Sequence, residues 1–263
     1  MNEAIGVLED LHNTRRLLQF VLRNHDDIFN KFDAVVEGWL EMIKSGKYPE
    51  RKEFDECFLE ANRLLLNYLS SYKTFVDHLQ TYITRTYGGE GTPEYQEFKT
   101  ITAVFYDNSF AYRFFYALRN YAQHCGVPVG RVKFDTRREP PNINYDFKVV
   151  FDRDGLLSTH QWKEKIREDL KSKDTEFELI PLLFEMTNNI NEISRNLEIT
   201  LSPKFIEAAK YLKGVFDHLP KSEGRVFIAY DVQTTEAGKL SGYTDIDIPM
   251  ETIEGLLSGD SGE

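Results

Sequence analysis

Apolar residues recur at helical spacing through most of the first 124 residues, and two short breaks interrupt this pattern. The breaks are "SGKYPE" (residues 45–50) and "GGEGTP" (residues 88–93), both rich in Gly and Pro. The pattern predicts one helical stretch up to about residue 43, a second over about 54–87 and a third over about 93–124. Gly126 is placed to end the third helix. Long helices joined by short breaks are typical of an antiparallel helical bundle.

After residue 126 the apolar spacing changes from helical to alternating. The stretch at about 129–158 predicts a β-hairpin with a Pro-rich turn, and a helix with Thr159 as N-cap is expected next. Two further helices are predicted, the second opened by Ser202 and Pro203. "GRVFIAYDVQ" predicts a strand, and a short helix is expected near Ile253. The predicted fold class is therefore mainly α, with a bundle domain (1–219) that contains the hairpin, and a C-terminal strand and acidic, partly flexible tail (220–263).

Composition limits the class of protein. The chain has 263 residues, of which 41% are hydrophobic and 13% aromatic, so a wholly disordered chain is excluded. No apolar run approaches the roughly 18 residues that a membrane span needs. The N-terminal residues lack the pattern of a secretory signal. With only Cys57 and Cys125 as cysteines, we expect a reduced, cytoplasmic protein without membrane contact.

The net charge of -11 hides an uneven distribution. From residue 231 to the end, eight acidic residues accompany a single lysine. Residues 110–140 are instead basic, and Asp135 and Glu139 are the only acids among them. Either cluster can be an ordinary solvated face, and the basic one can also attract phosphate groups. The basic residues of that stretch are Arg113, Arg119, Arg131, Lys133, Arg137 and Arg138.

Several motifs for cofactor or metal chemistry are absent from the sequence. It contains no G-x-x-x-x-G-K-[ST] phosphate loop, no G-x-G-x-x-G after a strand, no H-E-x-x-H and no paired C-x-x-C. "TDIDIP" could place Asp245 and Asp247 on one face of a strand, where a solvated face is the simpler interpretation. "FDRDGL" begins like a calcium loop but lacks the later ligands, so a turn is expected. We therefore predict no metal and no cofactor.

"RNYAQH" (residues 119–124) places four polar side chains in one of the most aromatic parts of the chain. At about 100° per residue, the residues divide between two sides of the helix. One arc is apolar and predicts the core stripe, made of Phe110, Phe114, Ala117, Leu118, Tyr121 and Cys125. A polar side contains Arg113, Tyr116, Asn120, Gln123 and His124. Arg119 falls about 140° from His124, so both could hold one small group only if the long arginine reached round the helix, the helix ended early or a second chain contributed.

An arginine, a polar residue and a histidine at the end of a helix in a helical bundle resemble the active motif of HEPN-domain ribonucleases. The matching residues are Arg119, Asn120 and His124. The resemblance implies a homodimer that joins two motifs at its interface and cleaves RNA through the ribose 2′-OH without a metal. It implies that His124 exchanges protons, that Arg119 stabilises the phosphoryl charge, and that Asn120 holds the imidazole or the phosphate. Many members of this family are toxins or antiviral effectors controlled by an inhibitory antitoxin or an activating partner protein.

The pattern by itself is short, and a second histidine satisfies it: His160 follows Arg153 in "RDGLLSTH". That match crosses a D-G turn, whereas the Arg119 match lies on a strongly patterned helix in the basic region. A structural alternative also exists for "RNYAQH". There Arg119 would pair with an acid on another helix, and His124 would bind the last carbonyls of its own helix or favour the helix C-terminus electrostatically.

Two functions follow from these patterns. The first is a metal-independent endoribonuclease, with Arg113, Tyr116, Gln123, Arg131 and Lys133 as substrate-binding residues around the catalytic set. Tyr112 and Tyr121 are further candidates for base stacking. The second is a non-catalytic helical module that binds a nucleotide or a protein. If His124 points into the core of its own chain, the second interpretation is favoured.

Overall fold

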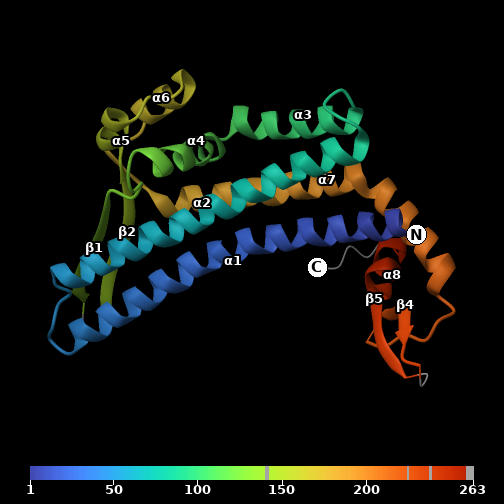
Figure 1. The fold of residues 1–263 in the computed structure, drawn as a ribbon. Helices are drawn as coiled ribbons and strands as arrows, with labels where there is room; N and C mark the ends of the chain where they lie inside the picture. The colour runs from blue at the N-terminus through green and yellow to red at the C-terminus, as the bar shows by residue number, and fades with distance from the viewer. Residues whose placement is uncertain (140–141, 224, 237–238, 259–263) are drawn as a thin grey trace. The chain divides into compact units, whose positions relative to one another are not determined.

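The computed structural model describes residues 1–139, 142–223, 225–236 and 239–258, with only the backbone described for some strand residues. The described chain is mainly helical, as predicted, with small antiparallel sheets (Figure 1). It divides into two compact units. The helical unit is Thr14–Leu197, and the terminal unit joins Met1–Asn13 to Glu198–Glu263. The predicted division near residue 219 stays a prediction.

Four helices of the first half form the frame of the helical unit. They are α1 (Asn2–Lys44), α2 (Arg51–Tyr87), α3 (Pro93–Asn108) and α4 (Phe110–His124), and α1 also extends into the terminal unit. The two breaks lie where the sequence predicted them. Gly88 ends α2 at φ 95°, a conformation that glycine adopts without strain, and Thr92 with Pro93 begins α3.

The predicted third helix is in fact two helices, and Ser109 separates them. Ser109 has extended backbone angles (φ -111°, ψ 122°) and caps α4, because its Oγ accepts a hydrogen bond from the Tyr112 amide. The same hydroxyl donates to Glu185 (2.6 Å) and accepts from Asn189 (2.8 Å), both on α7 (Leu179–Phe216). These contacts to a distant segment stabilise the break, which helical spacing alone could not reveal.

The predicted hairpin is confirmed as β1 (Arg131–Glu139) and β2 (Asn142–Asp152), which pair in an antiparallel register with Phe134 opposite Phe147. A short third strand that the sequence analysis missed, β3 (Glu176–Glu178), completes the sheet in the order β1-β2-β3. The predicted Pro-rich turn includes residues 140–141, which lie outside the described residues. Rings of the hairpin pack against Trp39 of α1, 5.1 Å from the Phe134 ring.

Two short helices follow the hairpin, α5 (Arg153–Thr159) and α6 (Glu164–Lys171). The expected N-cap at Thr159 is wrong, because this residue ends α5. "FDRDGL" forms a helix start rather than a plain turn, since Asp152 caps α5 by accepting hydrogen bonds from the amides of Asp154 and Gly155. The segment between α5 and α6 is fixed by Trp162, whose Nε1 donates to the Leu156 carbonyl at 2.8 Å.

The terminal unit contains the second half of α7, then β4 (Val226–Thr234), β5 (Leu240–Ile248) and α8 (Met250–Ser258). The predicted strand and the short helix near Ile253 are confirmed. The predicted helix start at Ser202 and Pro203 is wrong, because α7 continues through Pro203. Buried residues on both sides of Pro203, such as Leu201 and Phe205, extend one apolar stripe along α7 and favour continuation.

Candidate active site

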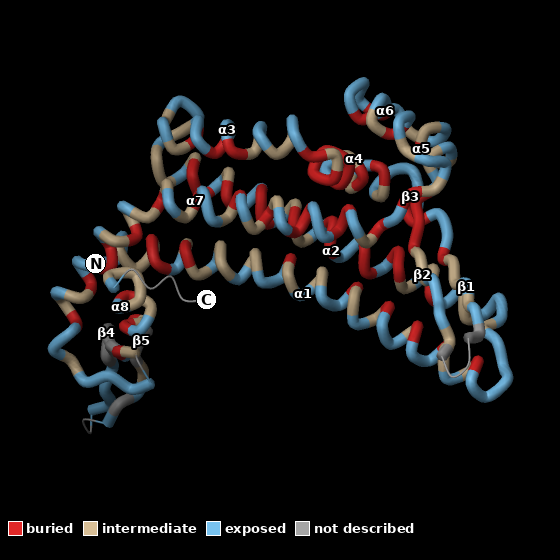
Figure 2. Tube along the Cα trace, turned by 180° about the vertical axis from the view of Figure 1, so that it is seen from behind, coloured by how far each residue is buried: buried red, intermediate tan, exposed pale blue. Residues whose placement is uncertain are grey.

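Most of α4 is embedded in the core of the helical unit. Figure 2 shows the concentration of buried positions along it. Phe114 is fully buried, with its ring 5.1 Å from Phe151 and 5.5 Å from Phe177, and Phe115 packs against Tyr68 of α2. Of the predicted core stripe, Phe114, Leu118 and Tyr121 are buried, and Phe110 and Ala117 are half-buried. Cys125 was predicted in the core and is exposed, because α4 ends at His124 and the chain turns away.

One side of the C-terminal half of α4 faces solvent. Tyr116 is 38% exposed, and Asn120, Gln123 and His124 are exposed as well. Among the described residues none donates to or accepts from the His124 imidazole. His124 is the last residue of the helix, where a positively charged imidazole is favoured by the helix dipole. The imidazole therefore does not point into the core of its own chain.

Arg119 lies half-buried beside α2 and forms no ion pair with any described residue. Its position is indicated by Tyr72 of α2, whose hydroxyl donates to the Phe115 carbonyl at 2.7 Å. Burial raises the pKa of Tyr72 well above its usual value, and the Arg119 charge opposes that shift slightly. The Arg119 charge is thus near enough to act on the Tyr72 hydroxyl, and no carboxylate of the described chain pairs with it.

Arg113 has the opposite surroundings. Its side chain is only 7% exposed, and its Nε donates to Asp169 of α6 at 2.9 Å. Its Nη1 donates to the Tyr106 and Asp107 carbonyls, at 2.6 and 2.8 Å, near the end of α3. The prediction that Arg113 binds substrate does not fit this placement, because the side chain is buried and its Nε and Nη1 donors are already used within the chain.

Arg131 and Lys133 lie on β1, and both interact with Glu176 of β3. The Arg131 guanidinium is 3.4 Å from the carboxylate, and Lys133 hydrogen-bonds to it. Their two charges are therefore partly neutralised, which weakens the basic surface expected from the sequence. Of the neighbouring arginines, Arg137 is exposed, and the side chain of Arg138 lies outside the described residues.

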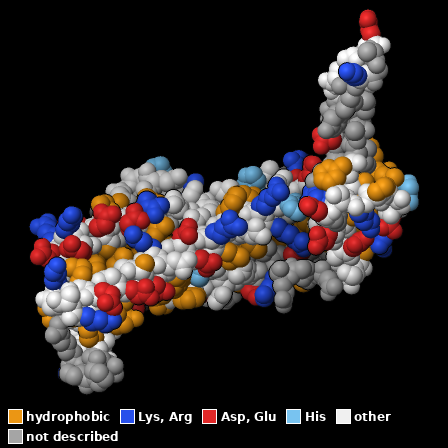
Figure 3. Space-filling model, turned by 90° about the horizontal axis from the view of Figure 1, so that it is seen from below, with side chains coloured by type: hydrophobic (Ala, Val, Ile, Leu, Met, Phe, Trp, Pro, Cys, Tyr) orange, Lys and Arg blue, Asp and Glu red, His pale blue; other side chains and the backbone are white. Residues whose placement is uncertain are grey.

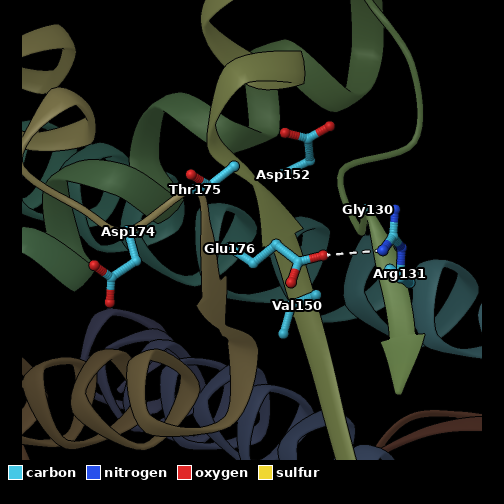
Figure 4. Close-up of a pocket in the computed structure, with 7 residues that line it drawn as sticks. All are labelled: Gly130, Arg131, Val150, Asp152, Asp174, Thr175 and Glu176. Atoms are coloured by element: carbon cyan, nitrogen blue, oxygen red, sulfur yellow. Dashed lines mark ion pairs between the residues drawn. The ribbon is translucent and has the colours of Figure 1, made fainter.

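The same strands border an open pocket of about 680 Å³ (Figure 4). Its carboxylates belong to Asp152, Asp174 and Glu176, and its one guanidinium belongs to Arg131. A lining with three carboxylates and one cation has a net negative charge, which repels phosphate. We therefore place no part of an RNA site in this pocket.

One basic residue near the exposed side of α4 could not be predicted from the sequence. Lys73 of α2 holds its Nζ 5.5 Å from the centre of the Tyr116 ring and also hydrogen-bonds to Asp77. No sequence pattern connects Lys73 to Tyr116, because they lie on different helices.

A face of the chain elsewhere carries basic and acidic side chains intermixed, as expected for a solvated surface (Figure 3).

Within the described part of the chain, no three His, Cys, Asp or Glu residues are grouped closely enough to hold a metal ion. Asp245 of β5 is exposed, and the side chain of Asp247 is outside the described set. In the same residues, no helix combines the length and apolar content required to cross a membrane.

Comparisons with protein-family models, curated proteins and solved structures gave no match to this chain. The functional proposal therefore depends on the residues of α4 and their surroundings.

Proposed function

We propose that the C-terminal half of α4 is the active site of a metal-independent endoribonuclease of HEPN type. The observation that supports this proposal is the surroundings of the Arg119 and His124 side chains. Among the described residues, Arg119 has no carboxylate partner, and His124 is exposed without a hydrogen-bond partner. Both are features of groups available to a ligand. The structural alternative needs an acid bound to Arg119, which the described residues do not supply, and it is met only in the position of His124 at the end of α4.

The proposed reaction needs a base, an acid and a cation around one phosphodiester. His124 accepts the proton of the ribose 2′-OH, whose oxygen attacks the adjacent phosphorus. The bond to the 5′-oxygen breaks, and that oxygen takes a proton from a second imidazole or from water, which leaves a 2′,3′-cyclic phosphate. Arg119 stabilises the negative charge on the phosphoryl oxygens, and Asn120 orients the phosphate or the imidazole.

The arrangement on one helix favours a second copy of the chain as part of the site. Arg119 and His124 are about 140° apart around an ideal helix, and α4 stays helical through His124. One chain therefore presents the imidazole to solvent and the guanidinium toward α2. In a homodimer with α4 against α4, the His124 of one chain could lie beside the Arg119 of the other.

Tyr116 and Gln123 are the predicted substrate-binding residues that we retain near the end of α4, and Lys73 is added from the structure. The Tyr116 ring can stack on an unpaired base, and the Lys73 ammonium, which also pairs with Asp77, lies 5.5 Å from the ring centre. Arg131 lines the acidic pocket and is left out of the proposed site, and Lys133 remains only as a secondary phosphate contact, because Glu176 partly neutralises its charge. A cytoplasmic toxin or antiviral effector, held by an antitoxin or released by a partner, is the corresponding biological proposal.

The test uses purified full-length protein, a fluorescent single-stranded RNA and excess EDTA. We expect Arg119→Ala to reduce cleavage roughly 10²–10³-fold and His124→Ala roughly 10²–10⁴-fold, as for other charge-stabilising and proton-transferring groups. Matched controls are Arg195→Ala and His78→Ala, which change exposed helical residues outside the site. Growth after expression of each variant gives a second measurement.

Equal cleavage by wild type and both site variants would contradict the proposal, because the activity would then come from a contaminant or another site. If wild type neither cleaves RNA nor affects growth, the non-catalytic binding module becomes the supported function.

A further inference from the structure

The end of α4 carries a second pair of chemically active side chains, Cys125 and His160. The exposed Cys125 Sγ lies 3.3 Å from the Nδ1 of His160, which follows α5. The two residues are 35 positions apart in sequence, and the contact brings together the end of α4 and the end of α5. It involves neither Arg119 nor Asn120, and only chain adjacency links it to His124.

The His160 ring is held in place by aromatic neighbours. Its centre is 4.8 Å from that of Trp162 and 5.9 Å from that of Tyr121, both edge-on, and these two rings stack on each other at 5.7 Å. Trp162 is anchored by its bond to the Leu156 carbonyl, and the Tyr121 hydroxyl accepts from Thr159 at 3.2 Å. These packed neighbours therefore hold the His160 imidazole in place beside the Cys125 sulfur.

This arrangement satisfies the geometric requirement for a base-activated thiol. A nucleophilic cysteine needs its proton taken by a neighbour within hydrogen-bonding distance, and it needs to be accessible. The C-terminal end of a helix disfavours an isolated thiolate and favours a positive imidazole. The His160 imidazole, rather than the helix, is therefore the group placed to take the thiol proton.

We propose that Cys125, activated by His160, is a modification site for small disulfides. In the step, the Cys125 sulfur gives its proton to His160 and attacks one sulfur of the disulfide. A new S–S bond forms, the old one breaks, and the leaving thiolate takes the proton from His160. Cys125 is oxidised and the leaving sulfur is reduced, so no other oxidant takes part.

The position of the adduct gives it a consequence for RNA cleavage, and this part depends on the proposed function. Cys125 directly follows His124, so a mixed disulfide there places a bulky group beside the imidazole. We expect the modified protein to lose RNA cleavage and to regain it when the disulfide is reduced.

The chemical test measures the reaction of the full-length protein with 5,5′-dithiobis(2-nitrobenzoate) near pH 7, with the modified residue identified by mass spectrometry. An unassisted cysteine is only a few per cent thiolate at that pH, so we expect the Cys125 rate to fall roughly tenfold in His160→Phe. This variant keeps an aromatic ring against Tyr121 and Trp162. His160→Asn removes the base in a second way, and Cys125→Ser should abolish the fast phase.

Cys57 is the internal control for folding. It is buried, and desolvation raises the pKa of its thiol to about 11, so it reacts slowly while α2 stays packed. A variant in which Cys57 remains slow is folded. A Cys125 rate unchanged by both His160 substitutions in folded protein would overturn the proposal, as would modification that favours Cys57.

The RNA test treats wild type and Cys125→Ser with glutathione disulfide and then dithiothreitol. Reversible loss of cleavage in wild type and no response in Cys125→Ser support the regulatory role. Equal responses of both proteins overturn that role. If wild type cleaves no RNA even when reduced, the proposed function fails, and the thiol kinetics still decide the modification site.

Discussion

Arg113 and Arg119 lie six residues apart on α4, and the fold uses them in opposite ways. Arg113 is buried and donates to Asp169 and to two carbonyls near the end of α3. Arg119 is half-buried, and no described carboxylate neutralises it. The N-terminal half of α4 is thus hydrogen-bonded to α3 and α6. The C-terminal half instead has polar side chains that are available to a ligand. The comparison teaches that a basic residue within a motif region indicates function only when its donors are free.

The largest loss of stability is expected when the buried Arg113 is replaced. Arg113→Met should lower the free energy of unfolding by about 3–5 kcal/mol, because it leaves Asp169 and two carbonyls without their partner. Arg119→Met should change it by less than about 0.5 kcal/mol, since no ion pair with described residues is lost. Urea denaturation of both variants measures the difference. Similar losses of stability would show that Arg119 is a structural residue, and the proposed site would lose its main support.

A smaller loss of stability is expected when the hydrogen bond that joins the segment after α4 to α2 is removed. The buried Asn62 accepts a hydrogen bond from the Val129 amide at 3.0 Å and donates to the Phe58 carbonyl. Asn62→Ala should cost about 1–3 kcal/mol, because a buried amide loses its acceptor. Asn67→Ala, which removes an exposed amide from the same helix, is the matched control. Hydrogen exchange at Val129 should accelerate in the alanine variant, and unchanged exchange would contradict the assigned role.

The smallest effect is expected at the beginning of α4. Ser109→Ala removes an N-cap, which typically costs about 0.5–2 kcal/mol, and should lie near the upper end because Asn189 and Glu185 lose a partner as well. Thr92→Ala removes a comparable cap from α3 and serves as the control. Thermal unfolding compares the two. If the Thr92 variant loses as much stability, the contacts of Ser109 to α7 add nothing to its capping role.

Local patterns were sufficient to predict much of the fold. The helical spacing and the two Gly- and Pro-containing breaks predicted α1 and α2, and alternation predicted the β1–β2 hairpin. The break at Ser109 and the strand β3 could not be predicted, because both depend on hydrogen bonds to distant segments. The same limit applies to Pro203, which the continuous apolar stripe of α7 overrides.

The candidate site, like the fold, could be predicted from the sequence only in part. The sequence by itself determined that Arg119, Asn120 and His124 lie near the end of an amphipathic helix, because helical periodicity is a local property. Only the tertiary structure decided which polar groups already have partners within the chain. Asp169 forms an ion pair with Arg113, and Glu176 forms ion pairs with Arg131 and Lys133. His160 contacts Cys125. Ion pairs and hydrogen bonds between distant residues depend on how separate elements pack, and no spacing within one element encodes that packing.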